Sequence, residues 1–466
     1  MQPGVGADGS DTFTPRTLIY DHRSSFGTLR QINALYQISE DQNQQLPQSL
    51  WSRGTAVQRQ QPIEPHPYQR SLDSGLEPPQ FSKESVRYWS DYNRVYYHPR
   101  SLIQLDDPVL TQGSQLSPWE QYNTGEDVFG TLDKEHDILD RDLRLFVEEA
   151  DHLQGLYLVT STDDAWGGFA SAYAERVEDE YGKVPRWIWG LEDDSPRPLD
   201  RQRLTQSNTI QSLLSLTGSG SLYMPVSNIS STQPPPYLSI DPTSQWHTSA
   251  LQTAALETIT LPTRLHPDDS SHSLMADIEA IFTAENSNRT ILDLSLSAQQ
   301  PTASTPPALS NGLPNGTSTT PMDLDEPDEP PPLDISLAPA GPAQPGPRRA
   351  HRQPHVFSRA DVLRGTWPDA LPSPSALARA FATPCLLPAP TSFPRIFGGA
   401  GAGVAVRARL ASGEGVAERL RACGRAVGRM GALLRAEREE VYSRLVGLAE
   451  EYVGGWEGGS DDGEDE

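Results

Sequence analysis

Apolar residues recur at two different spacings in the middle of the chain, and the change between them predicts an α/β fold. Within residues 137–154 they return every three or four positions, as on one face of a helix. The next run, GLYLVTS at 155–161, has few polar interruptions and predicts a central, parallel strand, because such strands are buried on both faces. A helix over 167–183 and a strand over 186–191 follow. Helix, strand, turn, helix, strand is the order of a doubly wound sheet with helices on both faces.

Residue patterns also predict elements and divisions in the rest of the chain. TPRTLIYD (14–21) predicts a buried strand, and 27–38 an amphipathic helix. Residues 301–350 hold thirteen prolines and few bulky apolar side chains, which predicts a disordered insert. Residues 416–456 are strongly helical. The expected divisions are an N-terminal segment (1–110), an α/β domain (111–300), a Pro-rich linker (301–350), a C-terminal helical region (351–456) and an acidic tail (457–466).

The composition of the chain limits the classes of partner and cellular location that are expected. The formal net charge is −25, from 62 acidic and 37 basic side chains, so direct binding to nucleic acid is not expected. Two cysteines allow neither a disulfide framework nor a cysteine-based zinc site, which suits a reducing compartment. No signal peptide is recognised, and no run approaches the roughly 20 apolar residues that span a bilayer. If the protein acts on an organelle, we expect a peripheral protein on its cytosolic side.

The turn after GLYLVTS is the candidate site with the clearest chemistry. A strand, a glycine-containing turn and a helix can bind phosphate at the helix N-terminus. Two carboxylates there repel phosphate unless a magnesium ion bridges them, and aspartate is also an ordinary helix cap. The capping interpretation is favoured, and the phosphate turn is degenerate. The residues concerned are Asp163, Asp164, Gly167, Gly168 and Ser171.

Other motifs favour ordinary structural roles. GSGSL (218–222) lacks the spacing of a nucleophile elbow and predicts a loop. FGGAGAGVAVRARL (397–410) lacks a preceding strand and the full dinucleotide fingerprint, which favours a flexible joint before a helix. His351 and His355 have helical spacing, but Pro354 interrupts any regular helix, so zinc binding is not expected. No metal site is predicted.

Two regions are candidates for partner contacts. The aromatic and basic run 85–105 predicts either core or an interface, because interface anchors favour Tyr, Trp and Arg. Arg94, His98 and Arg100 are the residues of this run expected to face outward, although for His98 a structural role is favoured over a partner contact. The basic C-terminal helix favours packing on the domain over contact with an anionic membrane, because glutamates dilute its charge.

Several of these runs resemble the Misato family. They are FTPRTLIYD (13–21), YWSDYNRVYYHPRSLIQL (88–105), LDKEHDILDRDLRLFVEEAD (132–151) and TSTDDAWGGFASAYAERV (160–177), and the second is the most specific. The resemblance covers about 1–290 and resumes at 355–365, at 391–397 and in the C-terminal helix with its tail. It implies a tubulin-like fold. It also implies a part in mitochondrial distribution and morphology and in partitioning of mitochondrial DNA, with spindle microtubules as a further link in animals.

The resemblance also sharpens two expectations. Where tubulin has a glycine-rich turn ending in Thr-Gly-Ser-Gly, this chain has the two aspartates, and Phe169 stands where a small residue would let the backbone approach phosphate. Family members usually begin with an apolar strand and a helix before the PGVGADG motif (3–9). The chain is therefore expected to lack the first strand and helix, which leaves a central strand position empty.

Together these arguments predict a non-enzymatic, tubulin-like scaffold for mitochondrial inheritance, without a cofactor, at the cytosolic face of mitochondria and in the cytoplasm. Its partners are expected to be cytoskeletal or mitochondrial surface proteins. Two alternatives remain. One is a GTP-binding tubulin relative, and the other is a cytoskeletal cofactor that acts on microtubules or on tubulin folding.

Overall fold

The computed structural model describes most of the chain in separate stretches. They are residues 2–5, 11–29, 63–105, 119–228, 234–284, 288–299, 333–340, 355–367, 375, 377–398, 403–430 and 438–453. Most of the helix predicted over 27–38 lies outside these residues, as does the acidic tail.

A parallel sheet forms the centre of the predicted α/β domain. It contains β5 (Leu156–Ser161), β6 (Arg186–Glu192) and β7 (Leu222–Ser227), in that order. Helices α4 (Ala165–Tyr181) and α5 (Leu199–Ser219) connect the strands. Every residue of β7 is buried, as expected for a parallel strand covered on both faces. The predicted tubulin-like α/β fold is confirmed.

Strand β5 differs from its prediction in one respect. It is parallel, but it lies at one end of the described sheet and not at its centre. Tyr157 and Val159 are accordingly 42% and 52% exposed. An apolar run predicts a central strand. How exposed the strand is, however, depends on whether a second strand pairs with its other edge, and the run itself does not specify that.

The N-terminal residues form small sheets and turns beside this domain. β1 (Gln2–Val5) pairs with β2 (Asp11–Thr14) antiparallel, and β3 (Ile19–His22) pairs with β4 (Leu102–Leu105) parallel. Between β3 and β4 lie α1 (Pro67–Asp73) and the 3₁₀ turns η2 (Trp89–Tyr92) and η3 (Pro99–Ser101). After β4 come α2 (Tyr122–His136), a π-helical turn (Leu139–Leu143) and α3 (Arg144–Glu148), which lead into β5.

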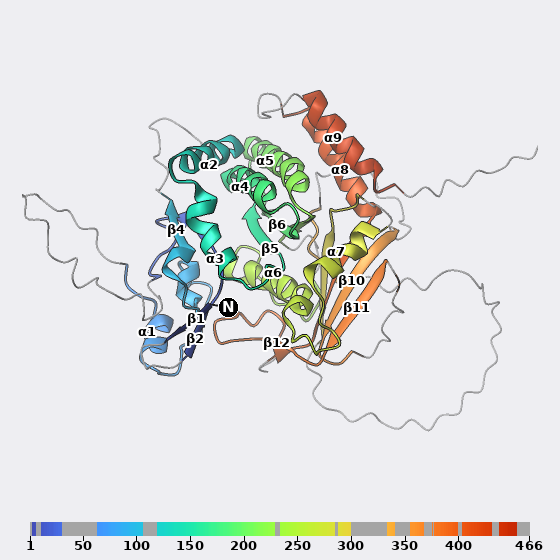
Figure 1. The fold of residues 1–466 in the computed structure, drawn as a ribbon. Helices are drawn as coiled ribbons and strands as arrows, with labels where there is room; N and C mark the ends of the chain where they lie inside the picture. The colour runs from blue at the N-terminus through green and yellow to red at the C-terminus, as the bar shows by residue number, and fades with distance from the viewer. Residues whose placement is uncertain are drawn as a thin grey trace, which may run out of the picture.

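A second sheet lies across α6 (Gln245–Ile259) and α7 (Met275–Thr283) from the first (Figure 1). The 3₁₀ turn η5 (Leu261–Arg264) joins the two helices. Both sheets contribute to one hydrophobic core around α6. It includes Trp189 and Met224 from the parallel sheet, Leu251 from α6, and Leu294 and Leu410 from the second sheet. On the opposite face of the parallel sheet lie α4 and α5, so helices cover both faces, as predicted.

The second sheet corrects the predicted helical region 351–456. Its strands are β8 (Asp293–Ala298), β9 (Ile335–Ser336), β10 (Val356–Arg364), β11 (Ala378–Thr383) and β14 (Val406–Gly413), in the order β11-β10-β14-β8-β9, and β12 (Leu387–Pro388) pairs separately with β13 (Gly403–Val404). The expected flexible joint at 397–410 therefore includes part of an interior strand. The arginines in this run obscured its alternating pattern of apolar residues.

The predicted linker 301–350 is also corrected in part. Residues 333–340 are ordered, and Ile335 and Leu337 are buried against the second sheet. These residues interrupt a proline-rich run whose remaining parts, 301–332 and 341–350, lie outside the described residues. A two-residue strand has no periodic signal of its own, so the composition of its surroundings dominated the prediction.

Among the described residues of the C-terminal region, helices appear only near its end. α8 (Glu414–Val427) and α9 (Arg438–Glu450) pack together and against α5 (Figure 1). Tyr452, just after α9, is buried, and its hydroxyl accepts from the backbone N–H of Ile291 at 2.7 Å. The packed arrangement is the one that the sequence favoured over a helix lying on a membrane.

A buried charge cluster fixes the alignment of β10 with β14. Asp361 is fully buried, and its Oδ1 accepts hydrogen bonds from the Arg407 Nη2 and the Arg409 Nε at 3.1 and 2.9 Å. Arg409 lies directly opposite Asp361 in the pairing of the two strands. A shift by one residue would turn these arginines toward the apolar core, so the cluster specifies the register.

Candidate functional site

The predicted phosphate turn lies at the carboxyl end of β5 and begins α4. Asp164 is the N-cap of that helix, and its carboxylate accepts a hydrogen bond from the Trp166 backbone N–H at 2.8 Å. Asp163 accepts from the Ser161 hydroxyl at 2.8 Å and lies 3.1 Å from the Arg197 guanidinium. The Asp164 carboxylate thus occupies the helix N-terminus, where a bound anion would otherwise lie.

The two glycines of the turn allow helices to approach each other. A methyl group at Gly167 would overlap the Ser212 hydroxyl of α5, and one at Gly168 would overlap the Tyr122 carbonyl oxygen at the start of α2. Gly125 of α2 packs against α4 in the same way, because a methyl group there would overlap the Ala165 carbonyl. Glycine at these positions is therefore required by contacts between α4 and its two neighbouring helices.

The last predicted member of the turn, Ser171, is one turn further into α4. Its side chain is buried, and the hydroxyl donates to the Gly167 carbonyl at 2.7 Å. Asn208 of α5 holds the turn from the other side: its amide donates to the carbonyls of Asp163 and Glu120, and its oxygen accepts from Tyr122. Asn208 was not predicted as part of the turn, because nothing in a helical run marks a polar residue as a contact to a distant loop.

Carboxyl groups crowd this edge of the sheet. Burial, followed by the charge of Asp163, raises the pKa of Asp164 to about 7. At the end of β6, burial raises the pKa of Glu192 to about 8, and Asp194 adds to the effect while Arg419 opposes it. Each of these carboxyl groups that is ionised would repel a phosphate placed here, so the turn disfavours an anion.

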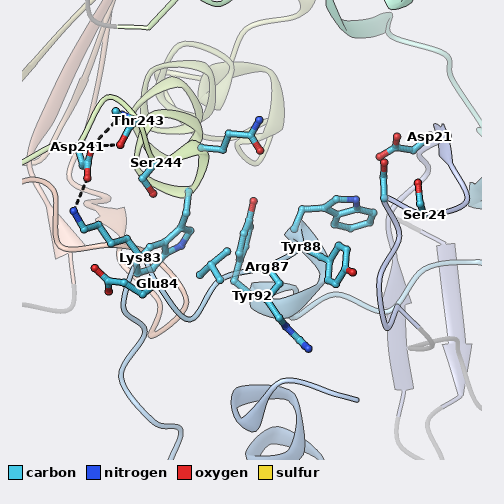
Figure 2. A pocket seen from close by; sticks show the side chains of 15 residues that line it. Asp21, Ser24, Lys83, Glu84, Arg87, Tyr88, Tyr92, Asp241, Thr243 and Ser244 are labelled. Carbon is cyan, nitrogen blue, oxygen red and sulfur yellow. Dashed lines mark hydrogen bonds and ion pairs between the residues drawn. The ribbon is translucent and has the colours of Figure 1, made fainter. Parts of the chain in front are cut away.

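A cleft of about 870 Å³ lies at the carboxyl end of β3 (Figure 2). One wall is the aromatic and basic run, with Tyr88, Trp89 and Tyr92, and the other is the loop that begins α6. Lys83 and Asp241 join the two walls through an ion pair at 2.7 Å. The aromatic wall is the run that the sequence marks as a candidate partner site, but its contact with Asp241 was not predicted, because Asp241 lies far away in the chain.

His22 connects the cleft with the turn. Its neighbour Asp21 lines the cleft, while the imidazole ring lies 5.4 Å from the ring of Trp166, two residues after the capping Asp164. Both features therefore occupy the carboxyl edge of parallel strands, where α/β proteins commonly bind ligands.

The predicted partner surface is only partly as expected. Arg94 and Arg100 are exposed, together with Val95 and Tyr96, and within the described residues neither guanidinium makes an ion pair. His98 does not face outward: it is 6% exposed, and its Nδ1 accepts from the Arg100 backbone N–H at 3.1 Å. The proline that follows it begins a 3₁₀ turn, and this geometry directs the ring onto Phe146.

The other motifs have structural positions where they are described. Residues 218–222 contain the end of α5 and the first residue of β7. His351 lies outside the described residues, and His355 packs edge-on against Phe357. In the part of the chain that the structure describes, no three His, Cys, Asp or Glu side chains converge as metal ligands would. Over the same residues, no helix is both long and apolar enough to span a membrane.

Comparison with known proteins defines the class and then the family. A Misato segment II tubulin-like domain matches residues 1–74 and a tubulin domain matches 78–265, so this is a tubulin-like protein. Protein DML1 of Phaeosphaeria nodorum is 38% identical over 485 residues, which cover all of this chain and 92% of that protein. Protein dml-1 of Neurospora crassa is 38% identical, with the same coverage, and protein dml1 of Schizosaccharomyces pombe is 32% identical over 58% of each chain. The chain belongs to the Misato family, together with the fungal DML1 proteins.

Replacing Gly168 with alanine should destabilise the protein, because the added methyl group would overlap the Tyr122 carbonyl oxygen. We expect a loss of about 2 kcal/mol in the free energy of unfolding, measured by urea denaturation. Gly130→Ala is the matched control: it lies within α2 with open space around it and should stabilise by up to about 1 kcal/mol. Equal effects of the two substitutions would contradict the packing role of Gly168.

Stability should depend on pH through Asp164. Its pKa is raised from 3.8 to about 7, so the native state keeps this proton in a range where the unfolded state has lost it. The stabilisation is full below pH 3.8 and is lost as the pH rises through about 7. Asp164→Asn should flatten this dependence in urea denaturation across the same range, because asparagine still caps the helix. The exposed Asp268→Asn should leave the slope unchanged, and an unaltered slope in Asp164→Asn would contradict the assignment.

Proposed function

We propose that this chain is a non-enzymatic, tubulin-like scaffold in the partitioning and inheritance of mitochondria and mitochondrial DNA, and in mitochondrial distribution and morphology. It acts as a peripheral protein at the cytosolic face of mitochondria and in the cytoplasm. Its contacts are with mitochondrial surface or cytoskeletal proteins, and it requires no cofactor.

The proposal that the protein is not an enzyme is supported chiefly by the turn at residues 163–171, which the chain's own side chains and helices fill. Asp164 caps α4, and Gly167 and Gly168 are covered by α5 and α2. A phosphate loop needs free backbone N–H groups and room for the ligand. Here the same backbone supports a contact between three helices, which favours a role through surfaces over a role through nucleotide chemistry.

The exposed run around Arg94 supports action through a protein surface. Val95 and Tyr96 are 41% and 49% exposed, between the two exposed arginines. Aromatic and arginine side chains are frequent anchors of protein interfaces. The net charge of −25 makes an anionic membrane or mitochondrial DNA a poor direct partner, so we place the contact with a protein.

Membership of the Misato family supports the mitochondrial part of the proposal, since the fungal branch of that family is associated with mitochondrial inheritance.

GTP binding is the alternative function that has a specific observation in its favour. The cleft beside the turn is large enough for a small-molecule ligand and has an aromatic wall that could stack on a base.

Titration with GTP and Mg²⁺ separates these two functions. We expect no saturable binding by calorimetry up to about 1 mM GTP, in protein shown to be folded by near-ultraviolet circular dichroism. Micromolar binding would overturn the proposal. Its loss in Asp164→Lys would then place the ligand at the turn, whereas its loss in Tyr88→Ala would place it in the cleft.

Reversing charge on the exposed run should release the protein from mitochondria. In a fungal cell that depends on this chain, Arg94→Glu with Arg100→Glu should lower its co-sedimentation with mitochondria by about tenfold and make mitochondrial inheritance uneven. The exposed arginines Arg203 and Arg438, changed to glutamate together, are the charge-matched control. Equal loss in both double variants would contradict a specific surface, and co-purification with tubulin without mitochondria would favour the cytoskeletal cofactor.

A further inference from the structure

The exposed face of α8 carries arginines that have no carboxylate partner among the described residues. Arg421 and Arg425 are exposed on the helix, and Arg429 is exposed in the turn that ends it. Within the described ranges, none of these three guanidinium groups makes an ion pair. Arg419 differs from them, because its side chain is only 11% exposed and its Nη2 lies 2.6 Å from the Asp293 carboxylate. We call the three exposed arginines the arginine stripe.

The members of the arginine stripe lie along one side of the helix, because they follow one another at intervals of four residues. Four residues advance an α-helix by about 6 Å, so Arg421 and Arg425 are about that far apart along the axis. The backbone N–H of Arg429 bonds to the Ala426 carbonyl at 2.9 Å, which continues the helical path past Val427. The stripe therefore presents three guanidinium groups in a row.

An exposed aromatic side chain borders the arginine stripe. Tyr442 of α9 is 51% exposed, and its ring lies beside Gly424, where an added methyl group would be 3.4 Å away. Tyrosine and arginine are frequent anchors of protein interfaces. The pair α8 and α9 lies on the opposite side of the molecule from β4 (Figure 1), so this surface is separate from the exposed run around Arg94.

The chemistry of this face favours a protein partner over a membrane. The apolar side of α8, with Leu420 and Val427, is buried against α5 and α9, so no apolar face is free to enter a lipid interface. The exposed residues of α8 are Glu418, Arg421 and Arg425, which are all charged. The formal net charge of −25 also repels an anionic bilayer and nucleic acid.

We propose that the arginine stripe binds an acidic helix of a partner protein, in which glutamate or aspartate recurs every four residues. Carboxylates at that interval lie about 6 Å apart on one side of a helix, which matches the spacing of the guanidinium groups. Each arginine can hold a carboxylate through two parallel hydrogen bonds. Because exposed ion pairs contribute little individually, recognition depends on forming all three pairs together. The inference stands independently of the proposed function.

The probe is a fluorescent, alanine-based peptide of about 16 residues with glutamate at every fourth position. A peptide of the same composition with glutamate at every fifth position is the matched control, because that interval distributes the carboxylates around the helix. We expect saturable binding of the first peptide to the full chain by anisotropy, about tenfold tighter than binding of the control peptide. Added salt should weaken it, because the contacts are between exposed charges.

Two variants of the protein test the site. The first replaces the three arginines of the stripe with alanine, which preserves the helix and should weaken binding by about tenfold. The second should bind as the unaltered protein does, although it changes the net charge by the same amount. It replaces three exposed arginines elsewhere, as Arg94→Ala, Arg100→Ala and Arg203→Ala. Far-ultraviolet circular dichroism checks that both variants are folded.

Four outcomes would overturn the proposal. Three of them are no saturable binding by folded protein, equal binding of the two peptides, and equal affinity of the two variants. The fourth is binding to vesicles of phosphatidylcholine and phosphatidylserine that only the stripe variant loses, because a membrane would then be the partner. Binding of the peptide only after deletion of residues 457–466 would also overturn it, since the stripe would then belong to the chain's own acidic tail.

Discussion

The position of α6 between two sheets is the constraint on which the rest of the molecule depends. Its residues Ala254 and Ala255 are fully buried, and its neighbours in the core come from both sheets (Figure 1). The apolar residues of this helix face both sheets, so they are buried only when both sheets cover it. The parallel sheet and the second sheet therefore form around it as one hydrophobic core. The loop that begins α6 carries Asp241, so the same helix places one wall of the cleft.

The parallel part of the fold could be predicted from sequence, whereas much of the second sheet could not. β5, α4 and β6 are consecutive, and each has a clear period, so local pattern was sufficient. In β14, arginines alternate with Val406, Ala408 and Leu410. Arginine is rarely buried without a partner, and the partner here is Asp361, far away in the sequence. Only the folded chain shows that Arg407 and Arg409 pair with Asp361.

The candidate site likewise contains features that could be predicted from the sequence and features that could not. The capping role of Asp164 was foreseeable, because it depends on residues two positions apart. The buried position of His98 was not, since it depends on Phe146 in a different element. The cleft likewise joins residues 83–92 to residues 241–246, and no spacing in the sequence relates the two. Contacts between residues within one turn can be predicted from the local sequence. Contacts between different helices and strands become visible only in the folded structure.

The glycines between α2, α4 and α5 have a consequence for how this turn can change over time. Gly125, Gly167 and Gly168 are each covered by a neighbouring helix, and Asp163 is fixed by Arg197 and Asn208. A single substitution that removed either aspartate would leave the helices in place and expose no room for phosphate. Several coordinated replacements on three helices would be needed, and the intermediates would be less stable than the starting protein. A turn with free backbone N–H groups for phosphate is therefore several simultaneous substitutions away from this one.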